Sequence, residues 1–245
     1  MMKMENLYDF CLHKKIPVKN EIKHIFFDLD HTLWDFDKNS ILAFDKIFQN
    51  DFPKIKTDEF IKHYIPINQA CWKLFQVDAI SHEELRYRRL KDSFDAISFT
   101  ISDAQINQIS EDYIQFLPDF NHLFEDALTV LKYLKERYEL HIITNGFAEV
   151  QFRKIANSKL EPYFKTITNS EMAGAKKPNP IIFQHALEKA NASKVESIMI
   201  GDSIEADVIG ALDFGMKALF FNPNQIEVED SIPQITTLAE LKLIF

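Results

Sequence analysis

Apolar residues recur at spacings of three and four positions between about residues 39 and 117, which is typical of one buried face of an α-helix. We predict about four helices in this segment, packed on one another, and no strand. Ser81 with Glu84 three residues later is a capping box and predicts the start of the third helix, whereas Pro66 is compatible with a kink inside a helix. The spaced apolar residues are Ile41, Phe44, Ile47, Phe48, Phe60, Ile61, Tyr64, Ile67, Leu85, Leu90, Ile106, Ile109, Tyr113 and Phe116.

From about residue 125 the pattern changes, because short apolar runs alternate with helical segments. Strands separated by helices of ~10 to 15 residues predict a parallel sheet that is covered by helices on both faces. All five glycines lie at residue 146 or later, where an α/β core needs tight turns between strands and helices. We expect strands in LHIIT, around residues 164–168, in SIMIG and in KALFF, and helices at 127–134, from 148, at 181–191 and at 206–214.

Another apolar run comes before the helical segment, in the sequence IFFDLDHTLW at Ile25–Trp34. We predict a buried strand whose carboxyl end carries Asp28 and Asp30 on one face. Two carboxylates ~4 Å apart repel by roughly 4 kcal/mol at an effective dielectric constant near 20. The pair therefore needs a cation, a proton or both close by.

Polar residues that suit phosphate and metal binding follow the later predicted strands. Thr144 and Asn145 end one strand, and Lys177 lies in the loop after the next. Asp202 and Asp207 follow the IMIG strand. Because ligands of open parallel sheets bind beyond the carboxyl ends of the strands, we expect these side chains to meet at one edge. There a hydroxyl and an amide can donate to phosphoryl oxygens, a lysine can neutralise their charge, and an acid can join the first pair in holding a hard divalent cation.

Four motifs at these strand ends, FFDLDHTL, IITN, the lysine of KKP and GDSIEAD, resemble those of the haloacid dehalogenase (HAD) superfamily over about residues 22–222. Within it, the runs DLDHTLWDFDKNS and AKKPNP look like the YjjG/YfnB-type 5'-nucleotidases. The resemblance implies an α/β, HAD-like Rossmannoid core with a parallel sheet flanked by helices, formed by 22–37 and 119–245. It also implies that the helical segment 38–118 is a type C1 cap domain, and it leaves 1–21 as an N-terminal extension.

The resemblance implies separate catalytic roles for the two acids of the first strand. Asp28 would be the nucleophile that forms an aspartyl-phosphate, and Asp30 would protonate the leaving alcohol and then deprotonate the hydrolytic water. Chemistry agrees with this division, because a nucleophile must be ionised and a general acid must keep its proton. Mg²⁺ would be held by Asp28, Asp202 and the backbone carbonyl of Asp30.

The same resemblance assigns the phosphate-binding residues. Thr144 and Lys177 would stabilise charge on the transferring phosphoryl group, with Asn145 as a further donor. Asp207 would orient Lys177 or a metal-bound water. Lys176 is the neighbouring alternative, and Lys177 is chosen because the lysine of the family immediately precedes proline.

Asp30 also favours phosphate-ester hydrolysis over dehalogenation, because displacement of halide needs no acid for the leaving group. We therefore predict a magnesium-dependent phosphatase that acts on a small phosphomonoester, with a nucleoside 5'-monophosphate as the first choice. A sugar-phosphate or phosphoglycolate phosphatase and a phosphomutase remain alternatives. Outside the enzymes, a phospho-aspartate signalling domain or a non-catalytic binding protein remains open.

Two residues near the acidic pair are candidates for contact with substrate. His31 follows the pair directly, although a loop histidine is often only a polar loop residue. Trp34 lies where the chain leaves the core, so it could line the substrate pocket or pack the hinge.

Charge and composition limit the partners. A formal net charge of −9 argues against a surface that binds a nucleic-acid polymer, and no run of ~18 apolar residues predicts a membrane-spanning helix. Cys11 and Cys71 lie far apart without metal-ligand spacing, which favours reduced thiols and a cytoplasmic protein. A monomer and a homodimer are both compatible with the sequence.

Overall fold

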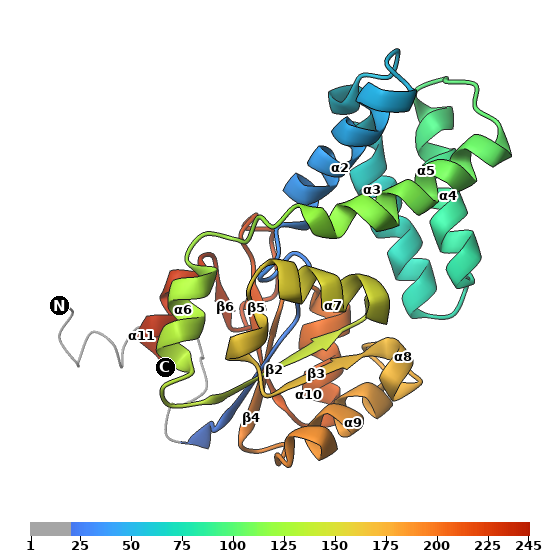
Figure 1. The fold of residues 1–245 in the computed structure, drawn as a ribbon. Helices are drawn as coiled ribbons and strands as arrows, with labels where there is room; N and C mark the ends of the chain where they lie inside the picture. The colour runs from blue at the N-terminus through green and yellow to red at the C-terminus, as the bar shows by residue number, and fades with distance from the viewer. Residues whose placement is uncertain (1–20) are drawn as a thin grey trace. The chain divides into compact units, whose positions relative to one another are not determined.

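The computed structural model describes residues 21–245, which form two compact units (Figure 1). One unit contains the described residues up to Asp35 together with Leu123–Phe245, and the other is Phe36–His122. We call the first the sheet unit and the second the helical unit. The predicted helical segment 38–118 lies within the helical unit, and most of the predicted N-terminal extension, including Cys11, lies outside the described residues.

Within the described residues, the sheet unit is built on six parallel strands in the order β3-β2-β1-β4-β5-β6. Strand β1 lies between β2 and β4, so the direction of winding reverses at β1. This is the switch point at which open α/β sheets place their ligands. The strands are β1 His24–Phe27, β2 Glu139–Thr144, β3 Thr166–Asn169, β4 Ser197–Gly201, β5 Lys217–Phe221 and β6 Gln234–Ile235.

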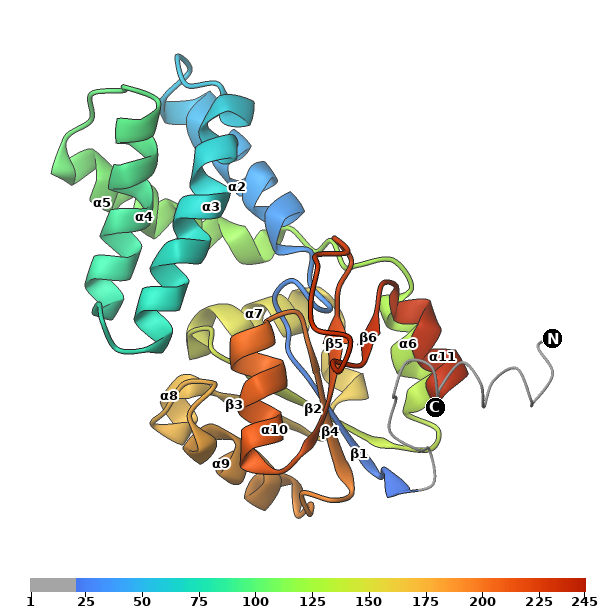
Figure 2. The ribbon, with the colours of Figure 1, turned by 180° about the vertical axis from the view of Figure 1, so that it is seen from behind.

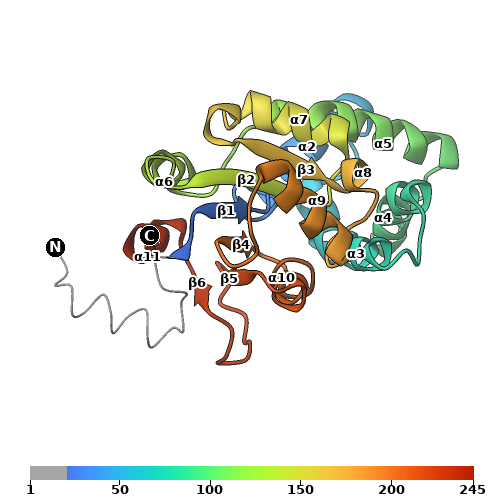
Figure 3. The ribbon, with the colours of Figure 1, turned by 90° about the horizontal axis from the view of Figure 1, so that it is seen from below.

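Helices cover both faces of the sheet, as predicted. Helices α6 (Ala127–Leu134) and α7 (Ala148–Asn157) lie on one side, and α9 (Pro180–Ala190) and α10 (Gly210–Phe214) lie on the other (Figure 3). Connections of one hand around the switch point produce this arrangement. The sheet unit also contains η3 Glu161–Tyr163, α8 Ser170–Ala173, the π-helix η4 Ile204–Ile209, η5 Leu238–Glu240 and α11 Leu241–Ile244 (Figure 2).

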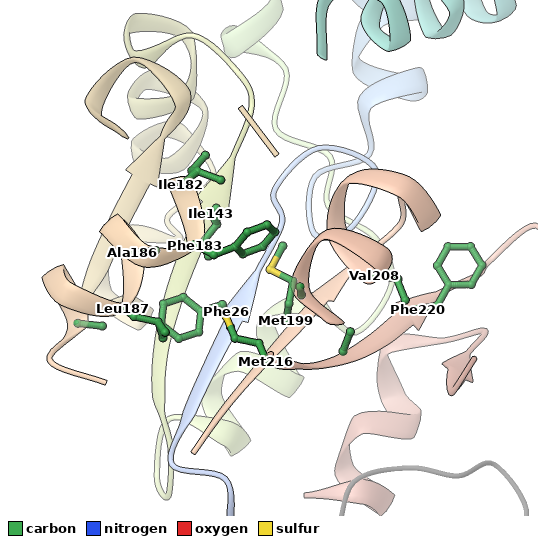
Figure 4. Close-up of a cluster of buried hydrophobic side chains, with 13 residues drawn as sticks. Phe26, Ile143, Ile182, Phe183, Ala186, Leu187, Met199, Val208, Met216 and Phe220 are labelled. Carbon is green, nitrogen blue, oxygen red and sulfur yellow. The ribbon is translucent and has the colours of Figure 1, made fainter. Parts of the chain in front are cut away.

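A buried apolar cluster fixes α9 and α10 against the sheet (Figure 4). Phe26 of β1 and Met199 of β4 belong to one cluster with Phe183 of α9 and Val208 of η4, and all four are fully buried. Because residues next to them in the strands point to the opposite face, the strands are apolar on both sides. This packing holds the carboxyl ends of β1 and β4 side by side.

Two details of the sheet unit differ from the prediction. The helix expected at 206–214 starts earlier, as the π-helix η4, in which Ser203 caps the N–H of Ala206. Strand β6 and the short helices η3, α8, η5 and α11 were not predicted, since each is only two to four residues long.

The helical unit contains four α-helices and a short 3-10 helix. The predicted capping box is confirmed: Ser81 Oγ accepts from the Glu84 N–H, and the Glu84 carboxylate accepts from the Ser81 N–H. Pro66 lies inside α3, where it does not end the helix. The helices are α2 Phe36–Asp51, α3 Thr57–Gln76, α4 His82–Ala96, α5 Asp103–Phe116 and η2 Leu117–Asp119.

An aromatic cluster forms the centre of the helical unit. The ring of Phe44 lies 4.5 to 5.6 Å from the rings of Phe48, Phe60, Tyr64 and Tyr113, measured between centroids. The apolar spacing in the sequence therefore marks the buried faces of α2, α3 and α5. The free thiol of Cys71 is buried in the same unit, and among the described residues no helix is long and apolar enough to cross a membrane.

Candidate active site at the carboxyl edge of the sheet

The chain leaves β1 in a tight loop that sends its two acids to different partners. The Asp28 N–H still donates to the Ile200 carbonyl, so Asp28 continues the pairing of β1 with β4. His31 has a positive φ of 62°, and the N–H groups of Leu33 and Trp34 both donate to the Leu29 carbonyl. After this loop the Asp30 side chain bonds to two residues of α7, whereas the Asp28 side chain bonds to Lys177. The two carboxylates therefore do not share one set of neighbours.

Lys177 is the cationic partner of Asp28. Its ammonium donates to Asp28 Oδ1 at 2.5 Å, to Asp207 Oδ1 at 2.6 Å and to the Ile143 carbonyl at 2.8 Å. Three acceptors satisfy the three N–H donors of a lysine that is only 2% exposed. Burial alone would lower the pKa of Lys177, but the carboxylates of Asp207 and Asp28 raise it above its ordinary value. Lys177 therefore stays charged at neutral pH.

Asp28, Asp202 and Asp207 form an acidic cluster, with one carboxylate oxygen of each within 4.8 Å of the others. Burial raises the pKa of Asp28 well above its ordinary value, and repulsion by Asp207 and Asp202 adds to this, while Lys177 opposes it. Burial and Asp207 also raise the pKa of Asp202 to about 8. When ionised, three acids with one ammonium would carry excess negative charge, and their oxygens are the donors that Mg²⁺ prefers. The residues present therefore fit a magnesium ion.

Thr32 completes this side of the site, and the sequence analysis did not assign it a role. Its hydroxyl donates to Asp202 Oδ1 at 3.2 Å, and Thr32 is fully buried. The bond links the loop after β1 to the acid after β4. The signal in the sequence was its position two residues after Asp30.

Thr144 and Asn145 end β2 beside this cluster, as predicted. Thr144 Oγ1 accepts from the Gly146 N–H at 3.2 Å and from the Gln151 side chain at 2.7 Å. The Asn145 side chain instead pairs with the backbone of Lys177, donating to its carbonyl at 2.9 Å and accepting from its N–H at 2.7 Å. The amide thus holds the lysine loop in place. Its expected role as a phosphoryl donor stays a prediction.

Asp30 binds two residues of α7 that the sequence analysis did not single out. Lys154 Nζ lies 2.6 Å from Asp30 Oδ1, and Gln151 Nε2 donates to Asp30 Oδ2 at 2.8 Å. Both residues are buried on the face of α7 that also carries Val150 and Ile155. The available signal in the sequence was two polar residues on the apolar face of the helix that follows β2.

The two substrate candidates lie close to Asp30 in the loop. Trp34 is fully buried, with Lys154 Nζ 4.3 Å from its ring centroid, which is a packing position. His31 is partly exposed, and its N–H donates to the Trp34 carbonyl. A contact of His31 with substrate stays a prediction.

Comparison of the sequence with models of known protein families agrees with the geometry of the site and with its motifs. A model of the family described as haloacid dehalogenase-like hydrolase matches residues 25–221. The chain belongs to this family. It is therefore a hydrolase with the predicted α/β fold, and the matched segment contains every residue of the site described above.

Individual relatives support the narrower resemblance. Pyrimidine 5'-nucleotidase PynA of Streptococcus pneumoniae is 30% identical over 210 residues, which cover 84% of this chain and 86% of the relative. Pyrimidine 5'-nucleotidase YjjG of Escherichia coli is 28% identical over 218 residues, which cover 89% and 93%. The structure of the HAD-hydrolase YfnB from Bacillus subtilis bound to magnesium is similar with a TM-score of 0.80 and 28% identity, covering 90% of this chain and 97% of YfnB. The predicted likeness to YjjG/YfnB-type enzymes is confirmed.

Proposed function

We propose that this protein is a magnesium-dependent phosphatase that hydrolyses nucleoside 5'-monophosphates, with pyrimidine nucleotides as the preferred class. The observation that carries the proposal is the separation of the two acids. Asp28 is paired with Lys177 inside an acidic cluster, whereas Asp30, two residues later, is held from α7. One carboxylate is thus kept for attack on phosphorus and the other for proton transfer.

In the first half-reaction, a carboxylate oxygen of Asp28 forms a bond to phosphorus, and the bond from phosphorus to the nucleoside oxygen breaks. Asp30 gives its proton to that oxygen, so the nucleoside leaves as a neutral alcohol. The product on the protein is an aspartyl-phosphate. Lys177 and Thr144 stabilise the charge that spreads over the phosphoryl oxygens.

In the second half-reaction, Asp30 is a carboxylate and takes a proton from a water molecule as the water oxygen attacks phosphorus. The bond from phosphorus to Asp28 breaks, which releases inorganic phosphate and restores both acids. Asp28 and Asp202 would hold Mg²⁺, with Thr32 fixing the orientation of Asp202. When bound, Mg²⁺ would neutralise charge on the phosphoryl oxygens.

The choice of a nucleotide rests on the relatives and on the helical unit. Both PynA and YjjG are pyrimidine 5'-nucleotidases by name. The helical unit is inserted between β1 and β2, directly after the loop that carries Asp30. We assign it the role of a cap that selects a small phosphorylated metabolite and excludes water during transfer.

The decisive experiment measures phosphate release from a panel of phosphomonoesters, with Mg²⁺ and with EDTA. The panel contains five nucleoside 5'-monophosphates, a hexose phosphate, phosphoglycolate and 4-nitrophenyl phosphate, and Asp28→Asn is the inactive control. We expect magnesium-dependent turnover with the highest kcat/KM for uridine, cytidine or thymidine 5'-monophosphate. Turnover that survives in Asp28→Asn would refute the mechanism, and a higher kcat/KM for the sugar phosphate or phosphoglycolate would refute the substrate class.

A further inference from the structure

We propose that Gln151 and Lys154 of α7 are positioning residues that hold the general acid Asp30 and the phosphate-binding Thr144 in one hydrogen-bonded clamp. The inference rests on the proposed function for its catalytic consequence. The contacts themselves are independent of which phosphomonoester the enzyme uses. We call the set Asp30, Gln151, Lys154 and Thr144 the α7 clamp.

Lys154 is a buried cation placed against Asp30. The residue is 2% exposed, and its ammonium lies 2.6 Å from Asp30 Oδ1 and 4.3 Å from the centroid of the Trp34 ring. A buried ammonium is stable only when a counter-charge and hydrogen-bond partners accompany it. Asp30 supplies the charge and Trp34 supplies an aromatic face. This placement fixes one carboxylate oxygen of Asp30.

Gln151 fixes the other oxygen and extends the clamp to Thr144. Its Nε2 group has two N–H donors, and they reach Asp30 Oδ2 at 2.8 Å and Thr144 Oγ1 at 2.7 Å. Asp30 is therefore held at both oxygens, so its carboxylate plane cannot rotate without breaking one of the two bonds. A single amide thereby ties the proton donor to the phosphate-binding hydroxyl.

The same bond orients the Thr144 hydroxyl. Thr144 Oγ1 already accepts from the Gly146 N–H and from Gln151, and a hydroxyl has two acceptor lone pairs and one proton. Both lone pairs are occupied, so the hydroxyl can only donate to a further group. A phosphoryl oxygen is a hydrogen-bond acceptor, so a hydroxyl that can only donate suits phosphate binding.

Two features of the sequence allow this arrangement. Gln151 and Lys154 are three positions apart in the chain (i, i+3), so both side chains project from one face of α7. Gly146 leaves room for Gln151, because a Cβ added at Gly146 would lie 2.4 Å from Gln151 Nε2. A glycine at position 146, in the loop before α7, therefore leaves the space that the Gln151 side chain occupies.

The clamp predicts a defect that depends on the leaving group. An alkoxide must receive a proton from Asp30 as it leaves, whereas 4-nitrophenolate leaves without one. General acid catalysis contributes about 10²- to 10⁴-fold, so in the first half-reaction misplacing Asp30 costs that factor only for the alkyl ester. A residue with a purely structural role would affect both esters equally.

The test compares the rate of leaving-group release in a single turnover, which reports the first half-reaction alone, for the alkyl phosphomonoester that the wild-type enzyme hydrolyses fastest and for 4-nitrophenyl phosphate. In Lys154→Met and Gln151→Met we expect this single-turnover rate to fall about 10²-fold for the alkyl ester and less than about 10-fold for the aryl ester. Lys154→Arg keeps the charge and should recover part of the loss. Lys132→Met removes an exposed lysine from α6 and is the matched control, expected to equal the wild type.

A thermal double-mutant cycle tests the contact without any substrate. Lys154→Met should lower Tm in the wild type, where it leaves the Asp30 carboxylate without its cation, and should lower Tm less in Asp30→Asn, where the buried ammonium faces no carboxylate at position 30. Equal losses in the single-turnover rate for both esters, or additive Tm shifts, would overturn the clamp. If no phosphomonoester is hydrolysed, the proposed function fails, while the cycle still decides whether the clamp exists.

Discussion

Lys177 donates to Asp207 Oδ1 at 2.6 Å, and both side chains are only 2% exposed. Asp207 is itself held, because its other oxygen accepts from the Ser203 N–H at 3.0 Å. The lysine that pairs with Asp28 is therefore also anchored from the π-helix η4, which follows β4. We therefore expect substitutions that remove Lys177 or displace Asp207 to lower phosphatase activity.

Replacing Lys177 by methionine should cost both stability and activity. The change leaves Asp28 and Asp207 buried without their shared cation, and breaking a buried ion pair on one side costs about 3–5 kcal/mol. We expect the free energy of unfolding, measured by urea denaturation in EDTA, to fall by that amount. Phosphatase activity should fall by at least ~10²-fold, because charge on the phosphoryl group loses a fixed donor.

Lys176→Met is the matched control for this experiment, because it removes the neighbouring, less buried lysine. A loss of activity as large in Lys176→Met as in Lys177→Met would contradict the assignment of Lys177.

Gly201→Ala should disable the site indirectly. A Cβ on Gly201, at the end of β4, would lie 2.2 Å from Asp207 Oδ2 and 2.6 Å from Asp207 Cβ, so the Asp207 side chain must move. Lys177 then loses its anchor. A misplacement of ~1 Å can cost about 10²-fold in rate, and we expect a fall in kcat of that order.

The control is Gly174→Ala, which adds a methyl group where no atom lies within 4 Å, at a positive φ of 67°. It should lower stability and leave kcat unchanged. The effects of Gly201→Ala and Asp207→Asn should be non-additive, and simple addition of the two would argue against a route through Asp207.

The metal-free protein should lose stability as pH rises from about 6.5 to 8.5. The pKa of Asp202 is raised from 3.8 to about 8 in the folded state, so the folded protein binds a proton there that the unfolded chain has already released. Stability from this group is complete at low pH and is lost as pH rises toward 8, with a slope of at most about 1.4 kcal/mol per pH unit. Urea denaturation in EDTA across this range measures the slope.

Asp202→Asn should flatten this dependence, because it removes the titrating group and the charge that raises the pKa of Asp28. Stability that is constant or rises with pH in the wild type would show that the acidic cluster is not protonated in this way.

The site residues that could be predicted from the sequence pattern are those at the carboxyl ends of predicted strands. Asp28, Thr144 and Asp202 each come directly after a buried apolar run, and neighbouring parallel strands necessarily bring such residues to one edge. Lys177 comes from a loop, and it was identified through the resemblance of its motif rather than from any pattern of strands.

The other parts of the site depend on how each helix is rotated about its own axis and on tertiary contacts, which the local sequence pattern does not specify. Gln151 and Lys154 meet Asp30 only because α7 presents one particular face to the loop after β1, and an apolar-face pattern also allows buried polar residues with other partners. The π-helix at Ile204–Ile209 likewise reflects tertiary contacts, since Asp207 must bond both Lys177 and the Ser203 N–H. Strand β6 is two residues long, too short to leave a pattern in the sequence, and is defined by its pairing with β5.

The last prediction concerns the opposite end of the sheet, where His141 is fully buried in β2. Its Nδ1 lies 2.9 Å from Thr166 Oγ1, its Nε2 lies 3.2 Å from His24 Nδ1, and its ring stacks on Phe26. Burial, together with His24 and Lys165, lowers the pKa of His141 from 6.5 to about 3. Between these values the unfolded chain binds a proton that the folded protein does not, so stability is lost as pH falls below about 6.5.

We expect His141→Gln to flatten the fall in the free energy of unfolding between pH 6.5 and 4.5, a window above the ordinary range of most carboxylates. The wild-type slope from this group is at most about 1.4 kcal/mol per pH unit. The variant will also be less stable at every pH because it loses the stacked ring, so the slope and not the level is the measurement. His63→Gln, an exposed histidine on α3, is the control and should keep the wild-type slope. If His141→Gln keeps it too, the acid sensitivity arises elsewhere and His141 is protonated in the folded protein as readily as in the unfolded chain.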